Sequence, residues 1–287
     1  MRPTLFGLAL AILIIVSPAA AQAGLERLAA AVSRGDVEQK RAALFQIRNL
    51  RSESASRLAI PALQDPNVLV RSTAVSSVIF LPPEEAADLL IPMLDDRDEF
   101  VRREAALALG EVAHQKATAP LLLLLRNDKV VEVRSAAAIG LGGLGDTAAV
   151  GPLVEILKKT PRESDEFLRR SAARSIGQIA QFIFTGTRDV VTPQNFLPDR
   201  YKDLKRRTAT GGDNIAFLPA IGVLVHVLEN SRENDDTRRE AAFALGAIGD
   251  RSALPALIAG TSSPDRYLAE VCREAIAKIN GGNPTQA

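Results

Sequence analysis

A ten-residue pattern recurs along this chain and limits what it can fold into. It reads Val-Arg-x-x-Ala-Ala-x-x-Leu-Gly, and its clearest copies begin at Val101, Val133 and Thr237. With weaker copies included, the second position falls at Gln39, Arg71, Arg102, Arg134, Arg169, Arg238 and Cys272. Successive steps are therefore 32, 31, 32, 35, 69 and 34 residues. A period in this range is typical of a stack of repeated units rather than of a globular enzyme core.

Each copy predicts one helix of an antiparallel pair. Asp98 is suited to cap a helix over which Val101, Ala105 and Leu109 recur at helical spacing and form an apolar stripe. A Pro-Leu segment follows, and proline is tolerated in the first turn of a helix because its missing N–H would be unpaired there. One helix pair cannot bury its stripe alone, so we expect pairs to stack around a continuous core.

Two Gly-Asp pairs mark breaks between predicted helices. Gly145 and Gly249 can take the left-handed conformation that ends one helix, and Asp146 and Asp250 can then cap the next. We interpret these carboxylates as structural rather than catalytic.

The recurring Val-Arg, Ala-Ala, Leu-Gly and Pro-Leu positions resemble HEAT repeats, in particular the short subtype first noticed in phycobilisome lyases. The resemblance covers about residues 25–280, apart from one interruption. It implies an all-α, right-handed solenoid of about seven helix pairs, over residues 24–282, with a tail at 283–287. It also implies that the Val-Arg-Ala-Ala helices line a concave binding face.

In HEAT arrays the Arg column and a preceding acidic or amide residue commonly form a ladder between repeats. The resemblance therefore implies that the stack is stabilised by Arg71, Arg102, Arg134, Arg169 and Arg238. The matching pairs in this sequence are Asn67 with Arg71, Asp98 with Arg102, Asp165 with Arg169 and Asn234 with Arg238. Arg suits such a role because its planar guanidinium makes several hydrogen bonds at once.

Residues 1–23 read as a secretory signal peptide. Arg2 is positively charged, Leu5–Val16 is an apolar stretch of 12 residues, and Ala21-Gln22-Ala23 is an A-x-A cleavage signal. The stretch is shorter than the ~20 residues that span a bilayer, so an uncleaved anchor is the less favoured interpretation. We expect cleavage between Gln22 and Gly24, no stable membrane insertion afterwards, and export to a periplasm, with full secretion as the alternative.

The charge balance argues against nucleic-acid binding. The chain has 35 Lys and Arg against 34 Asp and Glu, and loss of Arg2 with the leader makes the two numbers equal. Binding to phosphate backbones needs a positive field, which a neutral chain does not supply. Trp is absent and Tyr occurs twice, so the chain also offers few rings for stacking bases.

No catalytic or metal site is predicted. Deoxyhypusine hydroxylase, a HEAT-like enzyme family, holds di-iron with His-Glu pairs, but His114 and His226 are followed here by Gln115 and Val227. We therefore expect no metal and no cofactor. Similarity to bilin lyases is confined to the generic repeat positions. The Gly-rich run 140–145 lies at the end of a predicted helix, so it is not a phosphate-binding loop.

The double-length step between Arg169 and Arg238 contains an interruption at 183–215. Its prolines and glycines predict a loop insertion, and solenoid insertions project from one face and often carry binding. A basic cluster within it comprises Lys202, Lys205, Arg206 and Arg207, with Tyr201 beside it. Either it docks on an acidic partner, or it is a solvated loop without a role.

We therefore predict a non-catalytic, exported scaffold that binds a protein or peptide partner. Two columns of expected exposed positions run along the Val-Arg-Ala-Ala helices: Ser72, Arg103, Ser135, Arg170, Arg239 and Arg273, and Ser76, Leu107, Ile139, Arg174 and Phe243. Arg170, Arg174 and Arg239, with the 202–207 cluster, form a hypothetical basic strip for an acidic partner. Neutralisation by neighbouring acids is the alternative. A structural accessory subunit of an envelope complex is the alternative function, and an enzyme is less favoured.

Overall fold

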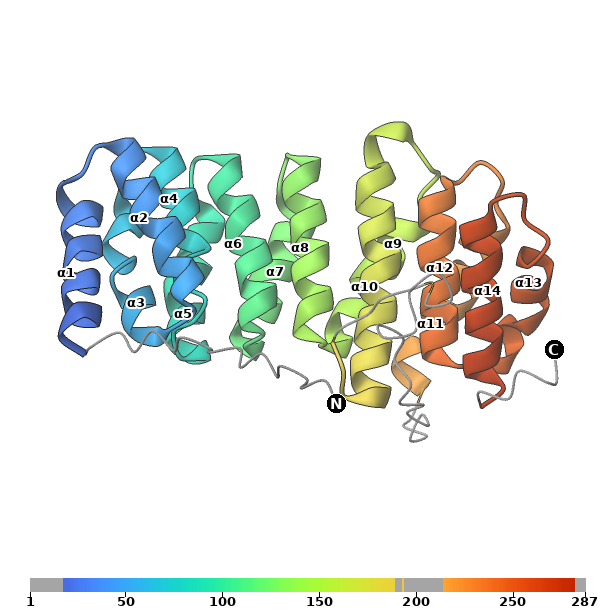
Figure 1. Ribbon diagram of the computed structural model, residues 1–287. Helices are drawn as coiled ribbons and strands as arrows, with labels where there is room; N and C mark the ends of the chain where they lie inside the picture. The colour runs from blue at the N-terminus through green and yellow to red at the C-terminus, as the bar shows by residue number, and fades with distance from the viewer. Residues whose placement is uncertain (1–17, 189–192, 194–213, 282–287) are drawn as a thin grey trace, which may run out of the picture.

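The computed structural model describes residues 18–188, 193 and 214–281 of the 287-residue chain. Within these ranges the regular structure is entirely helical. The helices stand side by side in two layers, and the array runs from α1 (Pro18–Arg34) at one end to α13 (Leu254–Gly260) and α14 (Arg266–Ile279) at the other (Figure 1). The predicted α-solenoid is therefore confirmed.

The array consists of pairs, each made of a first helix and a longer or more buried second helix. In the described ranges the pairs are α1 (Pro18–Arg34) with α2 (Val37–Leu50), α3 (Glu53–Arg57) and η1 (Ile60–Gln64) with α4 (Val68–Val75), α5 (Pro83–Leu90) and η2 (Ile91–Asp95) with α6 (Glu99–Val112), α7 (Thr118–Asn127) with α8 (Val131–Leu144), α9 (Val150–Leu157) with α10 (Glu166–Thr185), α11 (Leu218–Glu229) with α12 (Asp235–Ile248), and α13 (Leu254–Gly260) with α14 (Arg266–Ile279).

The second helices pack on one another along the array, and each first helix packs on its own partner. One apolar core follows this arrangement from Val32 in α1 to Ile276 in α14. The small alanines of the repeat lie in it; Ala105 and Ala106 of α6, for example, are fully buried. A continuous core of this kind is what stacked repeats need, because no single pair can bury its own stripe.

Local capping sets the helix boundaries as predicted. The Asp98 carboxylate accepts a hydrogen bond from the backbone N–H two residues later, where α6 begins. Gly145 and Gly249 have φ values of 71° and 78° and end α8 and α12. Asp146 and Asp250 then accept from backbone N–H groups at 2.9 and 2.8 Å and cap the next turns. The Gly-Asp pairs are therefore structural in the fold.

Helices α6 and α8 approach each other through glycines. A Cβ atom at Gly110 would lie 2.6 Å from the Cα atom of Gly140. A Cβ atom at Gly140 would overlap the carbonyl oxygen of Ala106, and one at Gly143 would lie 2.7 Å from the carbonyl oxygen of Gly110. The Gly-rich end of α8 therefore serves close helix packing.

The interruption begins later than predicted. Ile183–Thr185 continues α10, because Phe184 is buried there and packs on Phe217, with 5.6 Å between ring centroids. The chain resumes at η8 (Asn214–Phe217), so the ends of α10 and α11 meet across the interruption. The predicted basic cluster at 201–207 lies outside the described residues, as do most of the predicted leader and the tail.

Two further findings concern the termini. Helix α1 begins at Pro18, so it includes the last residues of the predicted leader. No helix in the described ranges has the length and hydropathy that crossing a bilayer requires.

Near the C-terminal end, Cys272 of α14 is fully buried, and burial raises the pKa of its thiol to about 12. The folded chain therefore holds this thiol away from the thiols of other chains.

Candidate functional site

The second helices of the pairs are α2, α4, α6, α8, α10, α12 and α14. Their solvent-facing sides form one surface that we call the long-helix face. In α6, Phe100, Arg103 and Leu107 are at least partly exposed on this face, at spacings of three and four residues. Ala105 and Leu109 of the same helix point into the core. The face therefore follows from the helical period of the repeat.

A row of exposed apolar side chains marks the start of these helices. Each residue of the row stands two positions after the N-cap residue of its helix, so all stand at the same helical position. The exposed fractions lie between 45% and 53% for Leu69, Phe100, Phe167 and Tyr267. Sequence reasoning missed this row, although the shared position after the cap was a signal that could have revealed it.

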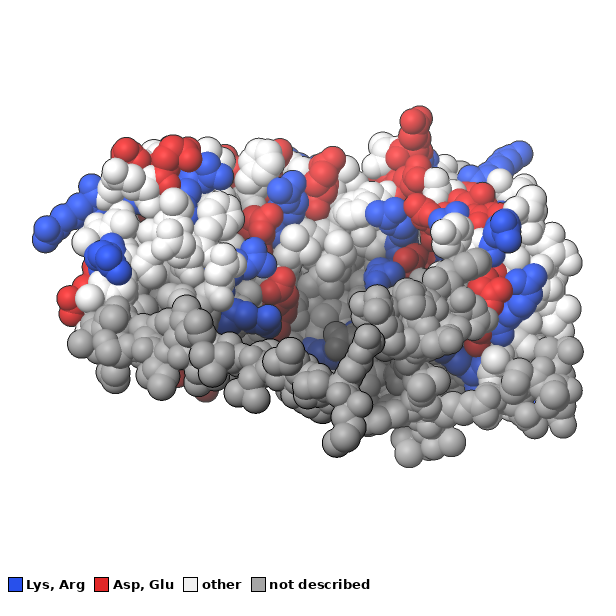
Figure 2. All heavy atoms as spheres, viewed as in Figure 1, with Lys and Arg blue, Asp and Glu red and all other residues white. Residues whose placement is uncertain are grey.

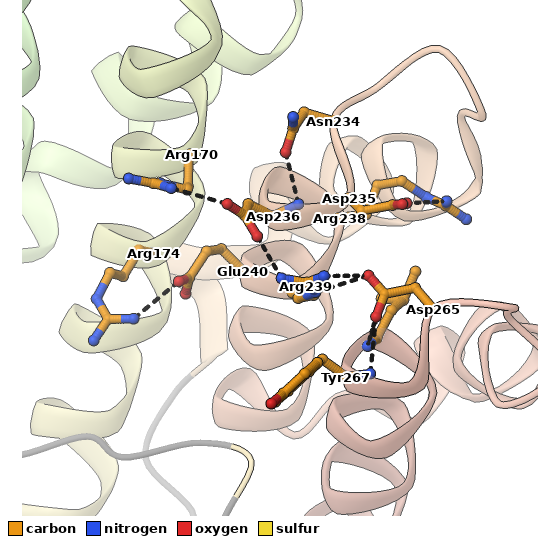
Figure 3. A network of polar contacts seen from close by, with 11 residues as sticks. Arg170, Arg174, Asn234, Asp235, Asp236, Arg238, Arg239, Glu240, Asp265 and Tyr267 are labelled. Carbon is orange, nitrogen blue, oxygen red and sulfur yellow. Dashed lines mark hydrogen bonds and ion pairs between the residues drawn. The ribbon is translucent and has the colours of Figure 1, made fainter.

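Guanidinium groups lie over the three aromatic rings of this row. Arg103 lies 5.0 Å above the ring centroid of Phe100, three residues before it in α6. Arg170 and Phe167 repeat the same arrangement in α10 at 4.9 Å. The ring of Tyr267 in α14 is covered from the neighbouring helix α12 by Arg239, at 5.4 Å (Figure 3). Such cation–π contacts contribute about 0.5–1 kcal/mol at exposed sites, so they hold the rings in place.

The three arginines predicted to form a basic strip come together, each with a carboxylate (Figure 3). Arg170 donates to Asp236 at 3.0 Å, and Arg174 donates to Glu240 at 2.9 Å. Arg239 donates through Nε to Asp265 at 2.9 Å and also pairs with Asp236. These contacts link α10, α12 and the cap of α14, and they match the alternative of local neutralisation.

Glu240 is a largely buried acid of this network. Burial raises the pKa of its carboxyl above the ordinary value, against the opposing effects of the charge and hydrogen bond of Arg174. Its Oε2 atom is buried and accepts no hydrogen bond from the described residues. As the pH falls, Glu240 would therefore become protonated at a higher pH than an exposed glutamate, and its ion pair with Arg174 would be lost there.

Charges of both signs alternate over the long-helix face. Figure 2 shows basic and acidic side chains interspersed, with no broad zone of one sign among the described residues. A groove of about 260 Å³ between α8 and α10 is more acidic, because three glutamates and one arginine line it. Phe167 and Arg170 line it together with Glu132, Glu163 and Glu166.

Two positions of the predicted exposed columns are buried instead. Phe243 is only 2% exposed, because its ring fills the space over Gly177 of α10, where a Cβ atom would overlap it. Ser135 is fully buried and donates its hydroxyl to the carbonyl of Val131 in its own helix. The exposed columns are therefore interrupted at α8 and α12.

The arginine ladder joins neighbouring repeats with partners other than those predicted. Arg71 meets Asp96 through Nε and Nη2 at 2.8 and 2.9 Å, and Arg102 meets Asp128 in the same way at 2.7 and 3.2 Å. Each carboxylate belongs to the loop before the next second helix. The expected partners Asn67 and Asp98 instead cap their own helices.

Arg169 makes the most buried rung. It holds Glu233 at 2.8 and 2.6 Å, and the two side chains are 3% and 2% exposed. Its remaining N–H groups donate to the backbone carbonyls of Ile156, Leu157 and Lys159. The predicted pairing with Asp165 was wrong, and the actual partner lies beyond the interruption.

The last rung is shifted by one residue. Arg238, the predicted member, donates to the carbonyl of Leu228 and to Asp235 of its own helix. Arg239 makes the rung to Asp265. Arg239 follows the acid Glu233 by six residues, just as Arg102 follows Asp96. Alignment on the Leu-Gly end of the repeat instead predicts Arg238 as the ladder residue. Among the described residues, Arg134, the remaining predicted member, donates only to backbone carbonyls.

Replacement of a ladder carboxylate should make stability less dependent on pH. Burial alone raises the pKa of Asp128, but the hydrogen bonds from Arg102 and the backbone of Val130, with the charge of Arg102, hold it below its ordinary 3.8. This contribution is present above pH 3.8 and is lost as pH falls through the lowered pKa. We expect Asp128→Asn to lower the free energy of unfolding, measured in urea, by about 1 kcal/mol at pH 7. The difference from the unmodified chain should shrink progressively below pH 3.8.

Asp95→Asn is a matched control, because Asp95 is exposed and has no ion pair with a described residue. It should unfold like the unmodified chain throughout. A loss in Asp128→Asn that stays constant from pH 7 to pH 3 would show that the ion pair is not its cause.

Neither histidine lies in a cluster of ligand side chains. His114 caps η3 (Gln115–Ala117) by accepting from the backbone of Lys116 at 3.4 Å, and His226 is exposed on α11. Across the described part of the chain, no group of three or more His, Cys, Asp or Glu side chains is placed to hold a metal ion.

The sequence matches the model of HEAT repeats over residues 25–110, 60–136 and 118–192. It also matches the PBS lyase HEAT-like repeat over residues 237–262. The chain belongs to the HEAT-repeat family. The resemblance to the short phycobilisome-lyase subtype is thereby confirmed.

Among relatives, human deoxyhypusine hydroxylase is 40% identical to this HEAT-repeat chain over 70 residues. The match spans 23% of this chain and 23% of the human enzyme. The chain therefore matches less than a quarter of that relative's length.

Two solved structures share the fold. An engineered protein superposes with a TM-score of 0.53 at 21% identity, over 91% of this chain and 69% of its own. The complex of CpcE and CpcF of phycocyanin lyase from Nostoc sp. PCC7120 superposes with a TM-score of 0.50 at 20% identity, over 90% and 93%. At these identities the likeness establishes the solenoid fold alone.

Proposed function

We propose that this HEAT-repeat chain is an exported, non-catalytic scaffold that binds an extended segment of a protein partner across its long-helix face. The HEAT-repeat scaffold supports a protein-interaction role. The observation that carries the proposal is the row formed by Leu69 and the arginine-covered rings of Phe100, Phe167 and Tyr267.

The spacing of the row suits an extended chain. Packed helices lie about 8–10 Å apart, and an extended chain advances about 3.3 Å per residue. Every third residue of a segment that crosses the second helices would therefore meet the start of the next helix. Only the helices with an apolar residue at this position offer an anchor, so the partner needs apolar side chains at a few of these points.

The rings are suited to serve as anchors. A Phe or Tyr side chain has two rotatable bonds, and the overlying guanidinium restricts them further, so little conformational entropy is lost on binding. Aromatic and Arg side chains also dominate binding energy at protein interfaces. Because Arg170 and Arg239 already have carboxylate partners, we propose that the segment contributes mainly apolar contacts to this face rather than dense negative charge.

Export rests on the signal-like composition of residues 1–23. N-terminal sequencing of the protein from the periplasmic fraction tests it. A mature chain that begins between Gln22 and Gly24 supports export, and an intact Met1 contradicts it.

Loss of two rings should strongly weaken partner binding without unfolding the protein. We expect Phe100→Ala/Phe167→Ala to weaken binding at least ~100-fold, since each interface anchor contributes more than about 1–2 kcal/mol. Both side chains are about half exposed, so the thermal melt should change little. Affinity capture of crosslinked partner from envelope extracts, followed by titration with the identified partner, measures the effect.

Leu123→Ala is the control, because Leu123 is an even more exposed apolar residue, on the first helix α7. It should leave capture unchanged. If the ring variant captures the same partner as the unmodified chain, or if the control loses it equally, the long-helix face is not the binding surface.

A further inference from the structure

The arginine ladder contains one position that differs from the others. Elsewhere a cation on a second helix meets a carboxylate in the loop before the next one, in the pairs Lys40–Asp65, Arg71–Asp96, Arg102–Asp128, Arg169–Glu233 and Arg239–Asp265. Arg134 of α8 forms no ion pair with any described residue.

Arg134 is nevertheless oriented like its neighbours. Its Nη1 donates to the carbonyl of Asp128 at 2.8 Å, just as Nη1 of Arg102 donates to the carbonyl of Asp96 at 2.9 Å. In Arg102 this anchor leaves Nε and Nη2 to hold a carboxylate. The same edge of Arg134 meets no acceptor among the described residues.

The sequence explains the difference. The rung acids Asp128 and Asp265 each stand 26 residues after their arginine, and the corresponding residue after Arg134 is Thr160. The loop between α9 and α10 spans 158–165, whereas the loop between α7 and α8 spans only 128–130. This longer loop accounts for the step of 35 residues in the repeat. Neither of its two acids pairs with Arg134: Glu163 lines the groove on the long-helix face, and Asp165 forms no ion pair with a described residue.

The longer loop also borders an open cavity of about 1290 Å³ beside α7 and α9. Its basic lining residues are Arg126, Arg134, Lys158, Lys159, Arg162 and Arg169. Two acids, Glu155 and Asp165, line it as well. Lys158 pairs with Glu155 at 2.6 Å, and Arg169 is neutralised by Glu233. Four cations therefore face one acid, Asp165.

We propose that this cavity binds an acidic segment of a partner protein, and that an Asp or Glu carboxylate of the segment completes the ladder on Nε and Nη2 of Arg134. The protein itself places carboxylates on this edge of Arg71 and Arg102, and the planar fork of arginine matches carboxylate geometry. The surrounding cations attract a segment with several negative charges. The site is separate from the long-helix face and does not depend on the function proposed for it.

Fluorescence anisotropy with labelled peptides and the full mature chain tests the proposal. The probe is a short peptide of alternating Asp and Gly, and the comparison peptide has Asn in place of Asp. We expect the Asp peptide to bind and the Asn peptide not to bind. Arg134→Ala should weaken its binding at least ~10-fold, since charge-assisted bidentate contacts are the strong ones. Thr160→Asp should weaken it similarly, because an internal carboxylate would then occupy Arg134.

Thr160→Asp keeps the test decisive if Arg134→Ala loses stability with its backbone hydrogen bonds, and it should itself raise the melting temperature. Arg251→Ala, which removes an exposed arginine elsewhere, should bind like the unmodified chain. Equal binding of the Asn peptide, or unchanged binding by Thr160→Asp, would overturn the proposal. Displacement of the peptide by an equal concentration of inorganic phosphate would do the same, because it would indicate a site for small anions.

Discussion

Glu233→Ala is expected to lower the free energy of unfolding by about 3–5 kcal/mol, the range for removing one partner of a buried ion pair. The side chain of Arg169 is 3% exposed, and the substitution would leave its guanidinium without a counter-charge. Its contacts to three backbone carbonyls at the end of α9 hold it in place, so it cannot turn to solvent. Urea unfolding followed by circular dichroism at pH 7 measures the loss.

Glu155→Ala provides the comparison. It removes the partner of Lys158 from an exposed pair in α9, and pairs of that kind contribute about 0–1 kcal/mol. Similar losses in the two variants would mean that burial of the Arg169–Glu233 pair has no particular importance for stability.

Gly140→Ala is expected to destabilise the protein by about 2–3 kcal/mol, toward the upper end for overpacking. The added methyl group would overlap the carbonyl oxygen of Ala106, and backbone atoms of a packed helix cannot move aside as a flexible side chain can. Helix propensity acts in the opposite direction, since alanine is favoured over glycine by about 1 kcal/mol in a helix interior.

Gly222→Ala separates the two effects. Gly222 lies within α11, and apart from the adjacent residues and backbone of its own helix no atom comes within 4 Å of a Cβ added there. This variant should be stabilised by up to about 1 kcal/mol in thermal melts, so the two substitutions should have opposite signs. A shift of the same sign in both would contradict the close-packing account.

The helices were predictable because their boundaries depend on neighbouring residues. Asp98 and Gly145 fix the ends of α6 and α8 through contacts within a few positions. The periodic alanines and leucines then place the core. Each repeat contains its own caps and apolar positions, so the solenoid can be predicted from one copy and its recurrence.

The ladder partners and the candidate site were harder to predict because they depend on contacts between repeats. The acid that meets Arg102 lies 26 residues away in a loop, and the one that meets Arg169 lies 64 residues away. The burial of Phe243 depends on the missing side chain of Gly177 in another helix. No local pattern reports such pairings, whereas the shared position of Phe100 and Phe167 after their caps was visible in the sequence.

The contact between Arg169 and Glu233 also separates distance along the chain from distance in space. These residues are 64 positions apart, yet they join adjacent repeats as closely as pairs only 25 or 26 positions apart do. The entropy of closing a loop grows only with the logarithm of its length, by about 0.6 kcal/mol for each doubling. Length changes within the interruption, between α10 and η8, therefore cost the stack little. The interruption is thus a place where the chain can gain or lose sequence while the order and spacing of its repeats stay the same.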